Sequence, residues 1–387
     1  MLSSFCDYKK PLTLGILGGG QLAKMLAQSA YSLGINISII ENHALSPAGD
    51  MTKQDFINGW ENDDELEKFI ESCDIVTLEN EFIDPKYLEK IEERKTVYPN
   101  SKTMLLVQDK LIQKQTFQKA GIPVPKFIDM PSADSCDKFA KEVGFPLVIK
   151  ARKYGYDGYG NATVFTDNEA RSAFDSFQKQ QIKRPLFVEQ FVDFSKEIAV
   201  MVARNKSGET VCYPAVETVQ YRHICHEVIA PAEIDASLRK EAQRLALKCV
   251  EAIDGIGIFG VEMFLTKGNE ILVNEIAPRP HNSGHYTIEA CYTSQFENCI
   301  RAVLNLPLGS PDMILPGAAM INLLGTREGS GVPSDITELL MHRKTWLHLY
   351  NKKQSRLGRK MGHVTAIANT PVEAKNKAKS ASEAIVW

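Results

Sequence analysis

The chain has 387 residues, 44% of them hydrophobic, and a formal net charge of −3. This length predicts two or three domains with real cores, while the balanced charge gives no general attraction to nucleic acid or anionic lipid. No apolar run approaches the roughly 18 residues of a membrane span, and eight scattered cysteines without a C-x-x-C pair indicate a reducing compartment, so we expect a cytoplasmic protein.

Strand and helix patterns alternate through the first hundred residues. Short apolar runs typical of strands occupy 12–17, 35–40, 74–78 and 96–98, and helical spacing occupies 21–33 and 84–95. This alternation predicts a parallel sheet with helices on its faces. Three glycines at 18–20 follow the first strand, but a dinucleotide fingerprint would require glycine at Ala23, so NAD binding is not expected.

The middle and the end of the chain are mixed. A helical stretch at 101–120 precedes Gly121 and a rigid Pro-Val-Pro segment, and Pro307 and Pro311 mark a second boundary. Between them we expect strands at 147–151, 186–191, 198–204 and 210–216, a hairpin at 258–276, and helices at 235–253 and 287–304. The last part is expected to contain strands at 318–324, 347–350 and 362–368 and a helix at 371–384. The predicted domains are 1–105, 106–308 and 309–387.

The predicted hairpin places two glutamates face to face. Its strands flank Gly268-Asn269, a favoured two-residue turn. That turn sets Glu262 opposite Glu275, with Cβ atoms roughly 5 Å apart. Two ionised carboxylates so placed repel each other, so either one is protonated or a cation such as Mg²⁺ lies between them. The pattern also fits a solvated hairpin edge, and Asn274 would join a metal site only through a local bulge.

Two basic features indicate binding of phosphate groups. An apolar strand ends at Lys150 and leads into a glycine-rich loop at 155–161, where backbone N–H groups can enclose an anion. Each feature alone is weak evidence, because a strand-end lysine often only extends into solvent. Seven basic residues between Arg343 and Lys360 fit either a solvated basic hairpin or a clamp for an anionic substrate.

Histidines offer a less convincing metal site. His281 and His285 have the spacing of a helical zinc pair, but Pro280 and Gly284 argue against a helix there. The segment fits better as a polar loop directly after the acidic strand.

Several short segments, spread over roughly residues 12–366, carry a family resemblance. They are GGQL (19–22), DKL (109–111), VIK (148–150), GYDG (155–158), VEQ (188–190), Glu262, NE (274–275), APRPHNSGH (277–285) and RKMGH (359–363). Together they resemble the 5-(carboxyamino)imidazole ribonucleotide synthases, ATP-grasp enzymes of purine biosynthesis. The GYDG and APRPHNSGH segments are specific to this family within the ATP-grasp group.

The resemblance implies a fold and a reaction. The fold is α/β and α+β, with a Rossmann-like N-terminal domain, a central ATP-grasp domain that holds ATP between two sheets, and a small C-terminal β domain. The reaction is the ATP- and bicarbonate-dependent carboxylation of 5-aminoimidazole ribonucleotide through carboxyphosphate, which gives ADP and phosphate. The implied cofactors are ATP and one or two Mg²⁺ ions, with no redox cofactor. The implied assembly is a homodimer.

The resemblance also implies roles for individual residues. Tyr156, Asp157, Arg279 and His281 are expected to be catalytic and to line the bicarbonate and imidazole site. ATP is expected to contact Lys110, Lys150, Gly155, Gly158, Gly160, Asn161, Glu189, Gln190, Phe191, Val192, Glu197, Gln220, Asn274 and Glu275. The ribonucleotide substrate is expected to contact Gln21, Glu79, Asn282, Ser283, Lys352 and Arg359. Magnesium is expected to bind Glu262, Glu275 and Asn274.

One position departs from the family pattern. The family usually has lysine or arginine where this chain has Tyr159, which implies weaker closure of the glycine-rich loop on the phosphates. Two other interpretations remain: a different ATP-grasp ligase, and a non-catalytic nucleotide-binding protein. The segments at 277–285 and 359–363 argue against the first, and Tyr159 alone favours the second.

Overall fold

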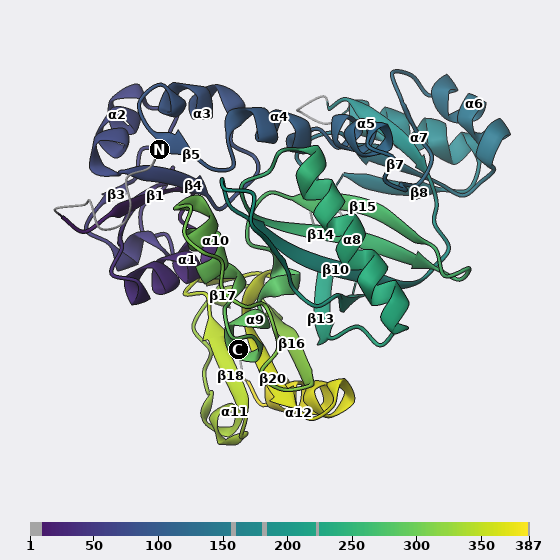
Figure 1. The fold of residues 1–387 in the computed structure, drawn as a ribbon. Coiled ribbons are helices and arrows are strands. Elements are labelled where there is room, and N and C mark those ends of the chain that lie inside the picture. Colours follow the sequence, from purple (N-terminus) through teal and green to yellow (C-terminus); the bar gives the residue numbers. More distant parts are fainter. Residues whose placement is uncertain (1–9, 156–159, 180–183, 222–223, 386–387) are drawn as a thin grey trace.

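The computed structural model describes residues 10–155, 160–179, 184–221 and 224–385 (Figure 1). Its N-terminal part is a parallel sheet whose strands, within the described residues, follow the order β3-β2-β1-β4-β5. The strands are β1 (Thr13–Leu17), β2 (Asn36–Ile40), β3 (Asp55–Phe56), β4 (Ile75–Leu78) and β5 (Thr96–Val97). The helices are α1 (Gln21–Ser32), α2 (Asp63–Ser72) and α3 (Pro85–Glu92), with a short 3₁₀ turn η2 (Gly49–Met51). The predicted parallel sheet is confirmed, and β3 and α2 are additions that the sequence pattern did not indicate.

The predicted helix at 101–120 is two helices, α4 (Ser101–Gln108) and α5 (Lys110–Lys119). Asp109 between them is extended, with φ −92° and ψ 107°, and its carboxylate accepts hydrogen bonds from the backbone N–H groups of Leu111 and Ile112. The single-helix prediction was wrong because this aspartate caps a new helix instead of continuing the old one.

A small antiparallel sheet follows, with the strand order β6-β9-β7-β8. Its strands are β6 (Phe127–Asp129), β7 (Leu147–Ala151), β8 (Asn161–Val164) and β9 (Leu186–Gln190). Helices α6 (Asp134–Val143) and α7 (Asp167–Gln178) pack on it around Leu147, Ile149 and Val188. In Figure 1 this sheet lies on the side of the molecule away from the N-terminal sheet.

The largest sheet has the order β15-β14-β10-β12-β13-β16-β20-β18, with β11 paired to β10. Its strands are β10 (Phe194–Arg204), β11 (Thr210–Cys212), β12 (Val216–Tyr221), β13 (Ile224–Ala230), β14 (Gly257–Thr266), β15 (Ile271–Ala277), β16 (Gly317–Leu324), β18 (Thr345–Leu349) and β20 (Lys360–Ala368). A separate short pair is formed by β17 (Gly329–Ser330) and β19 (Gln354–Ser355). The C-terminal strands therefore continue the central sheet through the pairing of β13 with β16.

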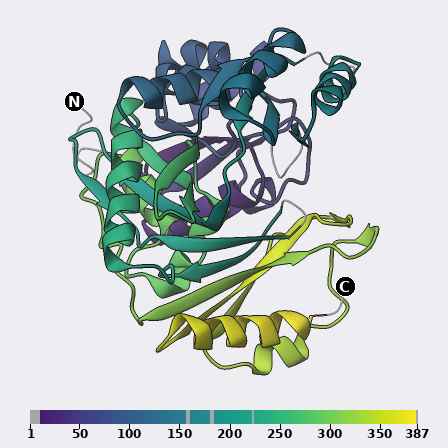
Figure 2. The same ribbon diagram turned by 90° about the vertical axis from the view of Figure 1, so that its right-hand side faces the viewer.

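Helices cover this sheet. They are α8 (Ala236–Ala252), α9 (Thr287–Ala290), α10 (Gln295–Val303), α11 (Thr337–Met341) and α12 (Pro371–Glu383), with the 3₁₀ turn η3 (Asn282–Gly284). Figure 2 shows α12 lying along the C-terminal strands, where its alanines pack against β16 and β20. Helix α10 packs against α1, so the N-terminal sheet and the large sheet share one core.

Two further predictions need correction. The strand expected at 210–216 ends at Cys212, and Val216 begins β12 instead. The helix expected at 287–304 is interrupted after Ala290, because Ser294 caps α10 by accepting a hydrogen bond from the N–H of Glu297.

Candidate functional site

The hairpin of β14 and β15 pairs Glu262 with Glu275, as predicted. The predicted two-residue turn was wrong, however. The N–H of Thr266 donates to the carbonyl of Glu270 at 2.9 Å, so the loop has three residues and Asn269 takes a φ of +62°. A bulge at Asn274 compensates for the extra loop residue, because Met263 pairs with Val273 while Glu262 still pairs with Glu275.

The bulge brings Asn274 into the site. The neighbours Val273 and Ile276 are buried in the core, whereas Asn274 and Glu275 are both only partly buried. The side-chain oxygen of Asn274 accepts a hydrogen bond from the ammonium of Lys150 at 3.2 Å. Two consecutive residues of one strand therefore serve the same site, which a regular strand would not allow.

The two facing carboxylates have different surroundings. The ammonium of Lys110, at the first position of α5, lies 2.5 Å from Glu275. Burial opposes ionisation of Glu275, but Lys110 outweighs it and lowers the pKa of Glu275 to about 2. Burial and the charge of Glu275 raise the pKa of Glu262 to about 8. The pair therefore holds one proton at neutral pH.

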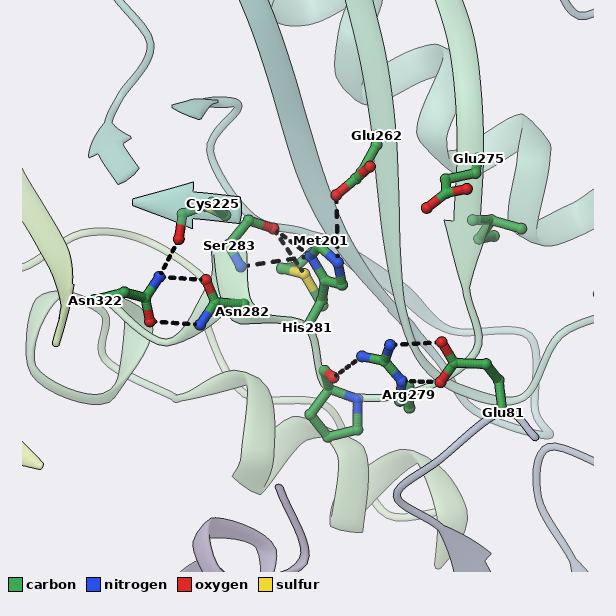
Figure 3. A network of polar contacts seen from close by, with 12 residues as sticks. Glu81, Met201, Cys225, Glu262, Glu275, Arg279, His281, Asn282, Ser283 and Asn322 are labelled. Carbon is green, nitrogen blue, oxygen red and sulfur yellow. Dashed lines mark hydrogen bonds and ion pairs between the residues drawn. The ribbon is translucent and has the colours of Figure 1, made fainter. Parts of the chain in front are cut away.

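His281 faces Glu262 from the segment that follows β15. Its Nε2 lies 3.4 Å from Glu262, and its Nδ1 lies 2.8 Å from the hydroxyl of Ser283 (Figure 3). The backbone N–H of Ser283 also donates to Nδ1, at 3.4 Å. Nδ1 is thus the acceptor and Nε2 carries the proton, which points toward Glu262. Burial and the charge of Arg279 lower the pKa of His281 to about 4, so the ring is neutral at pH 7.

Arg279 forms a two-pronged ion pair with Glu81. Its Nη2 donates to Glu81 at 2.7 Å, its Nε donates to the other carboxylate oxygen, and its Nη1 donates to the carbonyl of Pro280 at 3.1 Å (Figure 3). Burial opposes ionisation of Glu81, but Arg279 outweighs it and lowers the pKa of Glu81. Glu81 was not among the predicted site residues, although it lies just beyond the carboxyl end of β4, where parallel sheets place functional residues.

The predicted substrate residue Glu79 already forms hydrogen bonds with backbone groups. It is buried at the end of β4 and accepts hydrogen bonds from the N–H groups of Gly20 at 2.8 Å and Ala23 at 3.0 Å. A carboxylate at the first turn of α1 stabilises that helix and holds the glycine segment in place. Gln21, the first residue of α1, lies next to this contact and is partly exposed.

Several of the expected nucleotide residues lie where the small sheet meets the large sheet. Glu189 of β9 contacts the ammonium of Lys150 and lies 2.7 Å from that of Lys114, a lysine the sequence analysis missed. Burial opposes ionisation of Glu189, but Lys114 and Lys150 lower its pKa. Gln190 ends β9 and is followed by Phe191 and Val192, while Gly160 directly precedes Asn161, the first residue of β8.

Glu197 of β10 lies near Gln220 of β12 on the large sheet, and Gln220 favours the ionised form of Glu197. Burial raises the pKa of Glu197. The catalytic candidates Tyr156 and Asp157, with Gly158 and Tyr159, lie outside the described residues.

Asparagines and a buried serine hold the segment that carries Arg279 and His281. The side-chain amides of Asn282 and Asn322 donate to each other, at 2.9 and 2.6 Å, and Asn322 also donates to the carbonyl of Cys225 (Figure 3). Ser283 is only 1% exposed. These contacts anchor the segment to the C-terminal strands.

The basic residues near the C-terminus meet around β20. The ammonium of Lys352 donates to the carbonyl of Lys360 at 2.8 Å, and Arg359 donates to the carbonyl of Gln354 at 2.7 Å. Burial and the charge of Arg356 lower the pKa of Arg359. The charge of Lys360 acts on both Glu262 and His281, so this lysine lies near the same site, although it was predicted only as a member of the basic cluster.

A pocket joins several of these groups. Its lining includes Glu81, Lys110, Gly155, Glu275, Arg279 and His281. One predicted phosphate ligand (Lys110), one predicted metal ligand (Glu275) and two predicted catalytic residues (Arg279 and His281) thus line one cavity, whereas Lys150, Glu262 and Asn274 are not part of its lining.

The donor set fits a hard cation. The charge of Glu275 and burial make Glu262 retain a proton, a conflict that a cation between the two carboxylates would relieve. The amide oxygen of Asn274 lies on the same strand as Glu275. Magnesium accepts two carboxylates when phosphate oxygens and water complete its shell. Within the described residues, no group of three or more histidine, cysteine, aspartate or glutamate side chains could hold a metal ion by itself.

None of the described helices is long and apolar enough to cross a membrane.

Three family models match successive parts of the chain. They are the Ribonucleotide synthetase preATP-grasp domain at 12–108, the ATP-grasp domain at 115–296 and the Phosphoribosylaminoimidazole carboxylase C-terminal domain at 318–377. All three agree with the fold expected from the sequence.

Curated relatives and solved structures extend over most of the chain. The N5-carboxyaminoimidazole ribonucleotide synthase of Synechococcus elongatus is 38% identical and covers 91% of this chain and 88% of that protein. The phosphoribosylaminoimidazole carboxylase of Schizosaccharomyces pombe is 42% identical over 94% of this chain, which spans only 66% of that longer protein. The structure of the Aspergillus clavatus N5-carboxyaminoimidazole synthase, in complex with ADP and 5-aminoimidazole ribonucleotide, matches with a TM-score of 0.87 and 34% identity, over 96% of this chain and 98% of that one.

Proposed function

Because the chain belongs to the N5-carboxyaminoimidazole ribonucleotide synthases of the ATP-grasp group, we propose that it carboxylates 5-aminoimidazole ribonucleotide with ATP and bicarbonate in purine biosynthesis. The observation that carries this proposal is the pocket that joins Lys110, Glu275, Arg279 and His281. It combines groups suited to phosphate, to a cation and to a planar oxyanion.

The nucleotide would lie between the small and the large sheet. Lys110 and Lys150, which contact Glu275 and Asn274, would neutralise its phosphates, and the glycine-rich loop from Gly155 to Asn161 would cover them. Adenine would meet Glu189 and the backbone of 190–192, and the ribose would meet Glu197, with Gln220 beside it. Glu262, Glu275 and Asn274 would hold Mg²⁺, which supplies charge neutralisation for phosphoryl transfer.

In the proposed chemistry, an oxygen of bicarbonate attacks the γ-phosphorus of ATP and ADP leaves, which gives carboxyphosphate. The exocyclic amine of the imidazole then attacks the carboxyl carbon, or the CO₂ released from carboxyphosphate, and phosphate leaves as the amine loses a proton. This reaction needs positioning and charge neutralisation more than a protein nucleophile.

Arg279 and His281 would position the oxyanion. Arg279 uses three of its five N–H groups on Glu81 and Pro280, which leaves two for a planar oxyanion such as bicarbonate. His281 is neutral and carries its proton on Nε2, so it would act as a hydrogen-bond donor. The predicted partners Tyr156 and Asp157 would complete this part of the site.

The ribonucleotide would bind toward the C-terminal strands. Its phosphate would meet Lys352 and Arg359, while Gln21 and Glu79 would border the imidazole. Asn282 and Ser283 would act through the position of His281, since their polar atoms already bond to Asn322 and to the imidazole ring. We further propose a cytoplasmic homodimer.

Phosphate release measured with and without 5-aminoimidazole ribonucleotide and bicarbonate tests the function. We expect ATP hydrolysis to require both substrates and to yield the carboxyamino product. Release that is independent of the imidazole ribonucleotide over a wide concentration range would indicate a different ATP-grasp ligase. If ATP were not turned over under any condition, the chain would be a non-catalytic nucleotide-binding protein.

A further inference from the structure

Lys114 is a buried lysine to which the proposed reaction assigns no task. It lies on α5, one helical turn after Lys110, so both ammonium groups leave the same face of that helix. Lys114 is 2% exposed, and its ammonium lies 2.7 Å from one carboxylate oxygen of Glu189. The ammonium of Lys150 contacts the other oxygen. One buried carboxylate therefore lies between two lysines.

The two lysines differ in what else they can reach. Lys150 also donates to Asn274 at 3.2 Å, so its ammonium already lies between the small sheet and the large sheet, where the nucleotide is proposed to bind. Glu189 is the one ion-pair partner of Lys114 within 4.0 Å among the residues that the structure describes. Lys114 is buried against Glu189, whereas Lys150 contacts both Glu189 and Asn274 and so links the two sheets.

We propose that Lys114 is a positioning residue whose charge keeps Glu189 ionised and in place when Lys150 turns to the phosphates of a nucleoside triphosphate. This inference rests on the proposed function, in which Lys150 contacts ATP. Without Lys114, the departure of Lys150 would leave a buried carboxylate unpaired, which is strongly unfavourable. Lys150 would then stay on Glu189, and nucleotide phosphates would lose one of their two lysines.

A purely structural role makes a different prediction. If Lys114 only fastened α5 to β9, its loss would lower stability and would weaken nucleotide binding, if at all, regardless of the residue at 189. The proposed role depends on the negative charge of Glu189. The two possibilities therefore separate in a background where Glu189 is neutral.

The test measures the affinity of a non-hydrolysable ATP analogue with Mg²⁺ by calorimetry. It compares the wild-type chain with Lys114→Met, Glu189→Gln and the double variant. The matched control is Lys119→Met, which removes an exposed lysine from the last position of α5. Methionine keeps much of the lysine stem, and glutamine keeps an acceptor oxygen for adenine. We expect Lys114→Met to weaken binding by about tenfold or more, the double variant to bind like Glu189→Gln alone, and the control to bind like wild type.

Each outcome decides the matter. Equal affinity of Lys114→Met and wild type would overturn the proposal, as would a double variant weaker than Glu189→Gln by the same factor as the single lysine variant. Should Lys114→Met fail to fold, the double variant still keeps the proposal falsifiable, because binding about tenfold weaker than that of Glu189→Gln would overturn it. If the wild-type chain failed to bind the analogue, that result would contradict the proposed function itself, and this inference with it.

Discussion

Glu275 pairs with the ammonium of Lys110 at 2.5 Å, whereas Glu262, directly opposite it, faces the neutral imidazole of His281 at 3.4 Å. This difference in partners explains why one carboxylate is ionised and the other holds a proton. A cation that binds between the two carboxylates must displace the proton of Glu262 and the ammonium of Lys110. Its affinity is therefore expected to depend on pH.

Replacing Glu275 tests the proposed cation site. Glu275→Gln removes the ionised carboxylate and the partner of Lys110, so we expect kcat to fall by about 100-fold or more while the fold is kept. Steady-state phosphate release and circular dichroism measure the two effects. Glu270→Gln, at the exposed turn of the same hairpin, is the control and should behave as wild type. Near-normal turnover of Glu275→Gln would refute the assignment.

The pKa of Glu262 predicts how stability depends on pH in the absence of metal. Its pKa rises from 4.5 to about 8 in the folded chain, so the folded state binds the proton more tightly than the unfolded state. This contribution is fully present below pH 4.5 and is lost as the pH rises through about 8. The Glu262→Gln variant lacks this proton-linked contribution to stability. With EDTA present, the Tm of wild type should therefore fall relative to Glu262→Gln as the pH rises from about 5.5 to about 8.5, whereas a constant difference would contradict the prediction.

Arg152 joins the two elements that supply Lys110 and Lys150. It follows β7, binds Asp109 at 2.7 Å through Nη2, and accepts a hydrogen bond from the N–H of Lys110 at 2.8 Å through its carbonyl. Arg152→Ala should raise the KM for ATP by about tenfold, with a smaller change in kcat, because the spacing of the two lysines loosens. Arg171→Ala, which removes an exposed ion pair of α7, is the control. An unchanged KM would show that the backbone contact alone sets the spacing.

The amide pair of Asn282 and Asn322 should matter for both stability and turnover. Asn322→Leu removes the hydrogen bonds that join Asn322 to the Asn282 amide and to the Cys225 carbonyl, at a cost of about 1–3 kcal/mol in the free energy of unfolding. Urea denaturation measures this cost, and kcat should fall with it. The double variant Asn282→Leu/Asn322→Leu removes both amides and should be less destabilised than the sum of the two single changes. Additive losses would mean that the amides act independently.

Tyr159 offers a gain-of-function test. Tyr159→Lys restores the cation that the family usually has in the glycine-rich loop, and should lower the KM for ATP if that cation closes the loop on the phosphates. Tyr159→Phe is the control, since it adds no charge. An unchanged or higher KM for Tyr159→Lys would argue against this role.

The sequence predicted most elements of the fold but not their interruptions. Apolar spacing continues through 101–120 and 287–304, so periodicity alone could not reveal the breaks at Asp109 and Ser294. Both breaks depend on a short polar side chain that caps the next helix, and such residues also occur inside helices. The predicted length of the turn in the acidic hairpin was wrong for a similar reason, since Gly268-Asn269 suits a two-residue and a three-residue loop equally well.

Pairwise geometry separated the site residues that were predicted from those that were missed. Glu262 and Glu275 were found because strand alternation places them opposite each other. Glu81, Lys114 and Arg152 come from elements that meet their partners Arg279, Glu189 and Asp109 only in the folded chain. The helical spacing of Lys114 from Lys110 was the one available signal, and it did not indicate a partner.

The pairing of β13 with β16 has a consequence for how such proteins can be recombined. Since β13 pairs with β12 on one side and with β16 on the other, the C-terminal strands do not form a sheet separate from the central one. A chain truncated after residue 308 would present β13 as an open edge, because it would lose β16 and β20 together with α12, the helix that packs on them. A chimaera between relatives would therefore have to exchange the C-terminal strands together with a matching β13. The same ladder would transmit any misalignment at that junction to the strand that carries Glu197 and, through it, to the acidic hairpin.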